Sequence, residues 1–236
     1  MVNVLPQVAK LKGIALDILF PKYCVGCGKE GDFVCPSCLK SLSRITPPVC
    51  PMCGKPQTDD ILCYDCTDWQ AAIDGIRSPF AFEGVIRQAI HQLKYRNLRA
   101  LTASLAMLLE DYLMANPLPA EVLVPVPLHP RRLRERGFNQ SGHLARELGK
   151  LIKTVVVDDC LVRQRHTSPQ TTTSNVEERR SNISDAFTCN DHRLQGKQVL
   201  LIDDVATSGA TLDACAAAVK ASRAASAWGL VMAREL

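Results

Sequence analysis

The amino-acid sequence predicts an α/β fold, with a doubly wound and mostly parallel sheet preceded by a small cysteine-rich module. Eight of the 11 cysteines lie between residues 24 and 66, in a stretch rich in Gly, Pro and Asp that shows little apolar periodicity. From about residue 71, short apolar runs alternate with amphipathic segments of helical length. Strands separated by such helices form crossovers in a parallel sheet. We therefore expect two domains, residues 1–70 and 71–236.

Composition limits the classes of protein to consider. At 236 residues, with 47% hydrophobic and 22% charged residues, the chain resembles an ordinary globular protein. A net charge of +4 is too small for strong overall attraction to nucleic acid, so such a function must come from local basic clusters. Residues 1–20 are apolar at helical spacing but are interrupted by Pro6, Lys10, Lys12 and Asp17. We expect a packing helix there, no membrane span and, without a secretion signal, a cytoplasmic location.

The clustered cysteines form four Cys-x-x-Cys pairs, CVGC, CPSC, CPMC and CYDC. In a reducing cytosol such pairs usually hold zinc and not disulfides. Their spacing suits two tetrahedral sites, although an interleaved pairing of the four motifs remains open. Four thiolates leave no coordination position for a substrate, so zinc in such sites is structural. The predicted zinc ligands are Cys24, Cys27, Cys35 and Cys38 in one site, and Cys50, Cys53, Cys63 and Cys66 in the other.

The elements of the second domain follow from hydrophobic periodicity and from helix start and stop signals. The long apolar helix is closed by Pro117 and Pro119, and Ser174 to Glu177 has the form of a capping box that opens a short helix. From residue 71 onward no GxGxxG or GxxxxGK motif is present, so neither the dinucleotide fingerprint nor the Walker loop applies to this domain. The predicted strands are 75–84, 121–127, 154–157, 198–202 and 227–233, and the predicted helices are 85–94, 98–115, 139–152 and 211–224.

The stretch VLLIDDVATSGAT, residues 199–211, indicates a ligand site. Asp203 and Asp204 follow a buried strand at the edge of the sheet where ligands of open α/β folds collect. The small, hydroxyl-rich turn after them leads into a helix, whose backbone N–H groups and dipole attract an anion such as phosphate. Two carboxylates beside a phosphate are best explained by a neutral diol or a hard cation. A sugar phosphate satisfies both halves, with the turn residues Val205, Ala206, Thr207, Ser208, Gly209, Ala210 and Thr211 around its phosphate.

Residues 202–211 resemble the phosphoribosyl-pyrophosphate (PRPP) signature of type I phosphoribosyltransferases. More narrowly, the whole chain is similar to the ComF/GntX family, in which a zinc-ribbon region precedes a phosphoribosyltransferase domain. Further matches to that family are residues 93–95, 125–141, 163–170 and 178–187. The resemblance implies that the acidic pair contacts the ribose hydroxyls and that the turn holds the 5-phosphate. It also implies magnesium-dependent transfer of ribosyl phosphate from PRPP, with pyrophosphate as the leaving group.

Basic residues complete the predicted site. Arg131 and Arg132 come directly after the strand that ends at residue 127, where they can meet an anion held in the same crevice. The resemblance identifies this run as the pyrophosphate-binding loop and Lys94 as a second pyrophosphate contact. Residues 163–175 are polar and lack periodicity, so we expect a lid that closes over the ligand and excludes water. Arg163 and Arg165 of this lid, with the acidic pair, are the predicted catalytic residues.

Two other functions remain open at this stage. ComF relatives are associated with DNA uptake during transformation, which implies an accessory protein that binds single-stranded DNA or a DNA-processing protein through its zinc module. Basic residues are scattered through that module, but Phe33 and Tyr64 form only a thin platform for base stacking. The third function is a PRPP sensor that binds its ligand without turnover. The resemblance does not identify the acceptor, and a fold shared with enzymes does not prove catalysis.

Overall fold

The computed structural model describes residues 21–164 and 186–236. The expected N-terminal helix within residues 1–20, the capping box at 174–177 and Arg165 with the rest of the lid from residue 165 lie outside the described residues. No helix in the part of the chain that is described is both long enough and apolar enough to cross a membrane.

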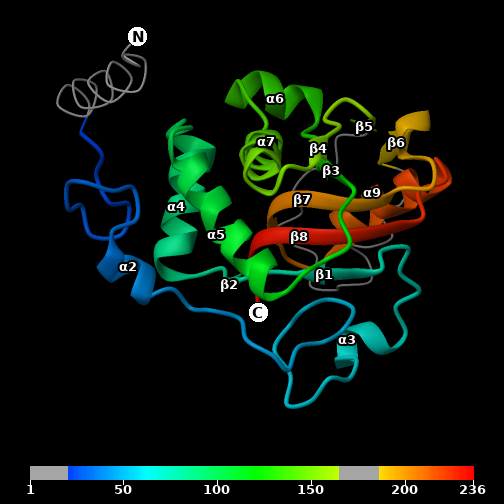
Figure 1. Ribbon diagram of the computed structural model, residues 1–236, viewed down its shortest axis with the longest axis horizontal. Coiled ribbons are helices and arrows are strands. Elements are labelled where there is room, and N and C mark those ends of the chain that lie inside the picture. Colours follow the sequence, from blue (N-terminus) through cyan, green and yellow to red (C-terminus); the bar gives the residue numbers. More distant parts are fainter. Residues whose placement is uncertain (1–20, 165–185) are drawn as a thin grey trace, which may run out of the picture.

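The centre of the fold is a six-stranded sheet in which every strand pair is parallel (Figure 1). The strand order is β1-β8-β7-β3-β4, and β2 pairs with β8 beyond the end of β1. This confirms the prediction of a mostly parallel α/β sheet. The strands are β1 (Gly75–Arg77), β2 (Phe80–Ala81), β3 (Val122–Pro125), β4 (Val155–Val156), β7 (Gln198–Ala206) and β8 (Ser226–Arg234).

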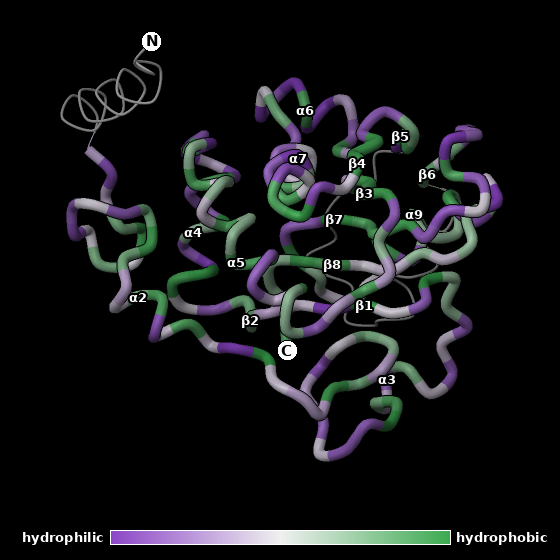
Figure 2. The backbone as a smooth tube through the Cα atoms, viewed as in Figure 1, coloured by the Kyte–Doolittle hydropathy of each residue, from purple (hydrophilic) through white to green (hydrophobic). Residues whose placement is uncertain are grey.

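Helices cover both faces of the sheet, so the fold is doubly wound as predicted. Alternate residues of the central strands point to opposite faces. Leu200 and Ile202 pack with one group of helices, and Val199 and Leu201 pack with α9 on the other face. Figure 2 shows the apolar central strands between these layers. The first group comprises α4 (Gly84–Tyr95), α5 (Leu101–Ala115) and α7 (Gln140–Ile152), and the second face carries α9 (Ala210–Ala221).

Several elements differ from the sequence-based prediction. The expected strand 75–84 is divided into β1 and β2 around Pro79, because proline cannot donate a hydrogen bond to a strand ladder. β7 continues four residues past its predicted end at Ile202, because β8 pairs with it as far as Ala206. Among the described residues from 71 onward, four elements were not expected: the helix α6 (Pro130–Arg136), the antiparallel pair β5 (Leu161–Arg163) and β6 (Phe187–Cys189), and the 3-10 helix η1 (His192–Leu194).

The cysteine-rich region carries two short helices, α2 (Pro36–Lys40) and α3 (Tyr64–Thr67), and lies along the outer edge of the sheet (Figure 1). Its backbone bonds to that edge. The amide of Ile76 donates to Met52 O at 2.7 Å, and the amide of Ala81 donates to Ser43 O at 2.9 Å. The edge strands β1 and β2 are therefore covered by the cysteine-rich region.

Candidate functional site

A crevice opens where the strand order of the sheet reverses. From β3 the chain first runs to β4 on one side and later returns to β7 on the other. Such switch points are where open α/β sheets bind ligands, outside the carboxyl ends of the strands. β3 ends with Pro125 paired to Ile202, while β7 continues to Ala206 beside β8, so one edge of β7 faces the crevice. The cavity there is about 660 Å³, and its lining includes the predicted site residues Lys94, Arg132, Arg163, Asp203, Asp204 and Thr211.

The two adjacent carboxylates are held by different partners. Asp204 is 7% exposed. Its Oδ1 lies 2.8 Å from Lys94 Nζ, and its Oδ2 accepts a 3.3 Å hydrogen bond from Gln140 Nε2. Asp203 Oδ1 accepts from Ser141 Oγ at 2.7 Å. Burial and the neighbouring charge of Asp204 raise the pKa of Asp203 to about 7, against the opposing effects of Ser141 and Lys94.

Gln140 and Ser141 are site residues that the sequence analysis missed. They begin α7, and the preceding Asn139 fixes this start by donating from Nδ2 to Val126 O at 3.0 Å. Gln140 Oε1 is buried and has no hydrogen-bond partner among the described residues, although it belongs to a side chain that lines the crevice. A buried acceptor of this kind is costly unless a ligand supplies the donor. The signal in the sequence was an amide and a hydroxyl at the start of an amphipathic helix.

The turn from β7 into α9, residues 207–211, is here called the TSGAT turn. Gly209 is the N-cap of α9 and has φ of 82°, a left-handed conformation that side chains disfavour. A Cβ atom at Gly209 would lie 2.8 Å from Ile76 Cδ1 and 3.1 Å from Trp69 Cη2. The first N–H groups of α9 have no carbonyl partner within the helix, so this turn can present donors to an anion. Thr211 is the residue of the turn that lines the crevice.

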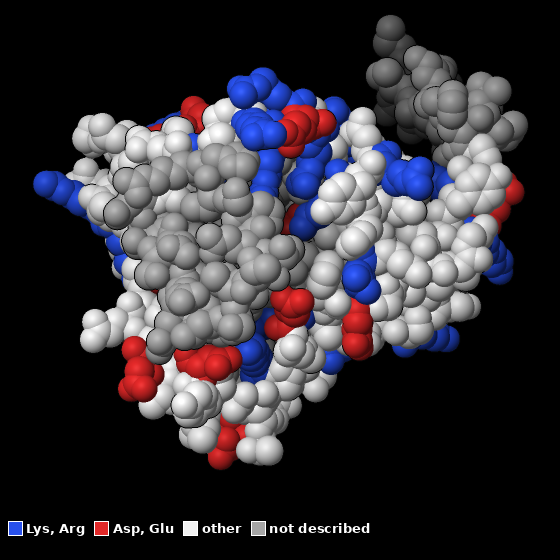
Figure 3. Space-filling view, turned by 180° about the vertical axis from the view of Figure 1, so that it is seen from behind, with Lys and Arg blue, Asp and Glu red and all other residues white. Residues whose placement is uncertain are grey.

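The basic residues divide into two groups. Arg132 and Arg163 line the crevice, and burial followed by the charge of Arg132 lowers the pKa of Arg163. Two guanidinium groups close enough to repel one another form a favourable place for a multivalent anion. Arg131 instead pairs with Glu135 on α6, with 3.0 Å between Nε and Oε1, and its side chain is 66% exposed. Figure 3, which views the molecule from behind, shows Lys and Arg side chains gathered near the top, the end of the molecule at which Figure 1 places α6.

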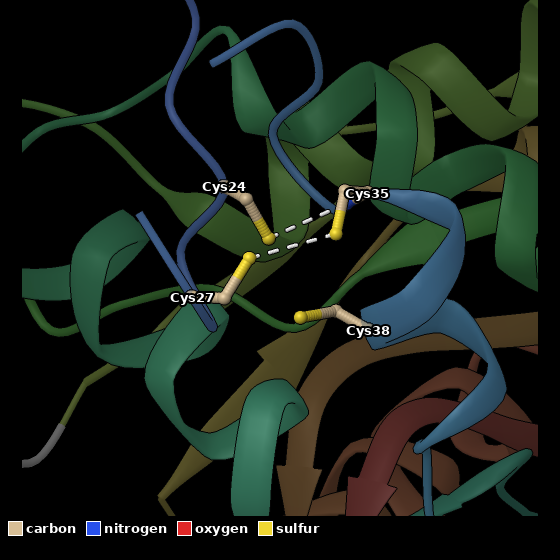
Figure 4. Close-up of side chains that lie close together, drawn as sticks. All are labelled: Cys24, Cys27, Cys35 and Cys38. Carbon is tan, nitrogen blue, oxygen red and sulfur yellow. Dashed lines mark hydrogen bonds between the residues drawn. The ribbon is translucent and has the colours of Figure 1, made fainter. Parts of the chain in front are cut away.

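The eight cysteines of the N-terminal region form two separate groups, each with all four sulfur atoms within 4.8 Å of one another. The first cysteine cluster is Cys24, Cys27, Cys35 and Cys38, whose side chains point toward a common centre (Figure 4). The second cysteine cluster is Cys50, Cys53, Cys63 and Cys66. The pairing of motifs is therefore sequential, and the interleaved alternative does not apply.

Both cysteine clusters fit a tetrahedral zinc ion. Zinc–sulfur bonds of about 2.3 Å place tetrahedral thiolates about 3.8 Å apart. The Sγ atoms of Cys27 and Cys35, and likewise those of Cys53 and Cys63, are separated by 3.6 Å. In the first cysteine cluster, the backbone amide of Cys35 donates to Cys24 Sγ at 3.3 Å, a contact that stabilises the thiolate form that binds metal. The chain thus has two zinc-binding cysteine sites.

The second cysteine cluster has a buried cation beside it. Arg234, at the end of β8, is 1% exposed, and burial lowers its pKa while Cys53 and Cys66 act in the opposite direction. A zinc ion with four thiolates carries a net charge of −2, so the guanidinium group compensates charge where water is excluded.

Comparison with known proteins agrees with this arrangement. Residues 15–67 match the family model of the double zinc ribbon domain, and residues 133–231 match that of the phosphoribosyl transferase domain. Competence protein ComFC of Bacillus subtilis is 29% identical over 197 residues, which are 78% of this chain and 76% of the relative. DNA utilization protein YhgH of Salmonella typhi is 31% identical over 187 residues, 76% of this chain and 80% of the relative. Competence protein F of Haemophilus influenzae is 27% identical over 188 residues, 76% of this chain and 81% of the relative.

The alignments cover about three quarters of this chain, so they extend beyond either of the two matched domain models alone. The order of parts is the same as in the structure, with paired cysteine clusters first and the parallel sheet after them. The chain belongs to the ComF/GntX family, in which a double zinc ribbon precedes a phosphoribosyltransferase domain.

Proposed function

We propose that the crevice binds PRPP with magnesium and that the protein transfers its phosphoribosyl group to an acceptor, releasing pyrophosphate. The observation that carries this proposal is that one crevice is lined by the Asp203–Asp204 pair, by the cations Lys94, Arg132 and Arg163, and by Thr211 at the start of α9. A phosphate receptor, a diol receptor and a pyrophosphate receptor would then follow one another along a single crevice. The cytoplasm, where PRPP is available, is the proposed compartment.

Each part of PRPP has a matching group on the chain. The TSGAT turn would receive the 5-phosphate through backbone N–H groups and the hydroxyls of Thr207, Ser208 and Thr211. The ribose hydroxyls would donate to the Asp203 and Asp204 carboxylates and to the buried Gln140 Oε1. The pyrophosphate would lie toward Lys94, Arg132 and Arg163, with Arg165 as a further contact and Arg131 at the outer rim.

The residues present also fit a magnesium ion. Carboxylate and amide oxygens of the Asp pair and Gln140 are hard ligands, and magnesium in such sites retains several waters and substrate oxygens. Magnesium, when bound, supplies charge neutralisation of the pyrophosphate. The chain's own contribution is electrostatic: the guanidinium groups stabilise negative charge on the leaving group, and the Asp pair stabilises positive charge developing on the ribose.

We expect titration calorimetry to show PRPP binding that requires magnesium and is weakened at least about tenfold by Asp204→Asn. The substitution removes charge at the diol receptor, and a hydrogen bond to a charged group is worth about 1.5–3 kcal/mol. Glu147→Gln, which changes a partly exposed carboxylate on α7 that does not line the crevice, is the matched control. Equal affinities in the Asp204 variant and the parent would remove the acidic pair from the site.

Turnover is tested separately, by following pyrophosphate release from magnesium PRPP across a panel of nucleobases and amines. Release with one acceptor, lost in Asp204→Asn, establishes transfer. Binding without release from any of them would support a PRPP sensor instead, which keeps the same site but not the chemistry.

A role in DNA handling is the second candidate, because the relatives are named competence and DNA utilization proteins. The zinc module presents an exposed Tyr64, 95% accessible, with Ile61 and Leu62 beside it in sequence and 59% and 42% accessible. An exposed aromatic ring of this kind suits stacking on single-stranded DNA or contact with a DNA-processing protein.

If DNA binding uses this surface, Tyr64→Ala should weaken binding of a fluorescent single-stranded oligonucleotide about fivefold or more, since stacking of a base on an aromatic ring contributes about 1–3 kcal/mol. The affinity should also fall steeply as salt is raised, and it should survive Asp204→Asn. Tyr23→Ala, which removes a different exposed ring of the same module, is the control. Unchanged binding in Tyr64→Ala would exclude this surface.

A further inference from the structure

The second cysteine cluster and the TSGAT turn are more than 140 residues apart in sequence, but side-chain contacts join them in the fold. Trp69 connects them. Its backbone amide donates to the carbonyl of the ligand Cys66 at 3.2 Å, and its ring packs on the second cysteine cluster. The far edge of the same ring meets Gly209, where a Cβ atom would lie 3.1 Å from Trp69 Cη2. One side chain thus contacts both a zinc site and the bend of the turn.

Further contacts join the same two regions. The amide of Ile76 donates to Met52 O, within the loop of the second cysteine cluster, at 2.7 Å, and the Ile76 side chain also closes against Gly209. The Arg234 guanidinium interacts electrostatically with the thiols of the second cysteine cluster. The backbone of Arg234 pairs with Ala206 at the end of β7. The end of β7 and the bend after it are therefore backed by residues that the cluster positions.

The start of α9 is fixed from the same side. Asp213, in the first turn of the helix, accepts backbone hydrogen bonds through Oδ1 from Ala72 at 2.7 Å and Ile73 at 3.0 Å. These two residues belong to the linker that leads from the second cysteine cluster to β1. The TSGAT turn is consequently held between β7 and α9, with the cluster and its linker behind both.

The first cysteine cluster has no such position. It packs at the start of α4, where a Cβ atom at Gly26 would meet Cys38 Sγ at 2.8 Å and the Val85 side chain at 2.9 Å. Its hydrophobic neighbours among the described residues belong to the face of the sheet that α4, α5 and α7 cover. The two zinc sites can therefore be compared within one chain, because only the second is joined to the TSGAT turn through Trp69 among the described residues.

We infer that the second zinc site sets the conformation of the TSGAT turn, with Trp69 as the positioning residue between metal and turn. The inference rests on the proposed function, because the turn is the proposed 5-phosphate receptor. Zinc would hold the Cys63–Cys66 segment, and that segment holds the Trp69 ring against Gly209, where the close contact leaves no space for a side chain. Losing zinc there lowers affinity for the phosphate end of the ligand without removing any group that touches the ligand.

The experiment compares Trp69→Ala and Trp69→Phe with Trp228→Phe, a change to the other tryptophan, which packs on Gly75 and Arg77. Zinc content, hydrogen exchange of a peptide covering residues 207–212 without ligand, and calorimetric affinity for ribose 5-phosphate are measured on each full-length protein. Trp69→Ala should keep two zinc ions, exchange about tenfold faster in that peptide and bind ribose 5-phosphate about fivefold or more weakly. Trp69→Phe should restore part of both effects, and Trp228→Phe should show neither.

A second comparison uses the metal itself. Cys63→Ser, at the second site, should accelerate exchange in the 207–212 peptide, while Cys24→Ser, at the first site, should leave that peptide unchanged. Exchange in this peptide that is equal in Trp69→Ala, Trp69→Phe and the parent overturns the inference, as does an equal response to the two cysteine variants. Absence of ribose 5-phosphate and PRPP binding in the parent protein would instead contradict the proposed function, and the exchange measurements still decide the positioning role.

Discussion

Replacing Cys63 by serine is expected to reduce bound zinc from about two ions per chain to about one, and to unfold the loop around the second cysteine cluster. The four cysteines of that cluster are buried together, and the apolar side chains that pack against them among the described residues are those of Met52 and Trp69. Structural zinc sites contribute about 10–16 kcal/mol of apparent binding free energy, so loss of one ligand is not compensated by packing. Elemental analysis combined with thermal unfolding measures both effects.

Cys160→Ser is the matched control for this experiment. Cys160 is a buried thiol, 6% exposed, that belongs to neither cysteine cluster, and burial raises its pKa to about 12. Its replacement should leave the zinc content at two ions. A Cys63 variant that keeps both zinc ions, or a folded parent protein that contains no metal, would contradict the assignment of these sites.

The second large effect is expected from Lys94→Met, which leaves Asp203 and Asp204 without their neighbouring cation. The Lys94 and Asp204 side chains are 20% and 9% exposed, and breaking an ion pair of this burial should lower the free energy of unfolding by about 3 kcal/mol at pH 8. Chemical denaturation at pH 8 and at pH 5 measures the change. Lys150→Met, which removes a largely exposed pair with Glu147, should change stability by no more than about 0.5 kcal/mol.

The loss should depend on pH in a defined direction. The native pKa of Asp203 is raised to about 7 by burial and by Asp204, and Lys94 is a charge that opposes this rise. Because the native pKa of Asp203 exceeds its unfolded value, its favourable contribution to the free energy of unfolding is complete below the unfolded pKa. That contribution is lost as pH rises through the native pKa. At pH 5 Asp203 is already protonated, so the variant should lose less stability there than at pH 8. Equal losses at the two pH values would show that Lys94 does not act through this carboxyl.

The parallel sheet could be predicted because its strands and helices are long apolar runs with clear periods. The 198–202 run and the helix after it were identified from the sequence, and so were the eight cysteines, whose spacing carries a specific chemical meaning. The short elements could not be predicted. β5 and β6 have only three residues each and pair across an intervening segment of more than 20 residues, which leaves no local signal.

The residues of the candidate site that lie together in one motif were predicted from that motif, Lys94 was added by the family resemblance, and Gln140 and Ser141 were missed. Asp203 and Asp204 follow one another, and the crevice contains both. Gln140 and Ser141 reach the same carboxylates from α7, more than 60 residues earlier, and only the crossing of α7 over β7 brings them there. Arg131 was expected in the crevice, but residues 130–136 form a helix in which Arg131 reaches Glu135 one turn later instead. A run of arginines does not reveal which of its members faces inward.

The covering of β1 and β2 by the cysteine-rich region has a consequence for how the chain behaves among its own copies. An open parallel sheet ends in strands whose free N–H and C=O groups can pair with another molecule and seed aggregation. At one end of this sheet, β4 has only two residues and offers a short template. At the other end, the ribbon already occupies backbone groups of Ile76 and Ala81. The ribbon therefore covers this edge against edge-to-edge association, and we expect loss of its zinc to promote aggregation as well as unfolding.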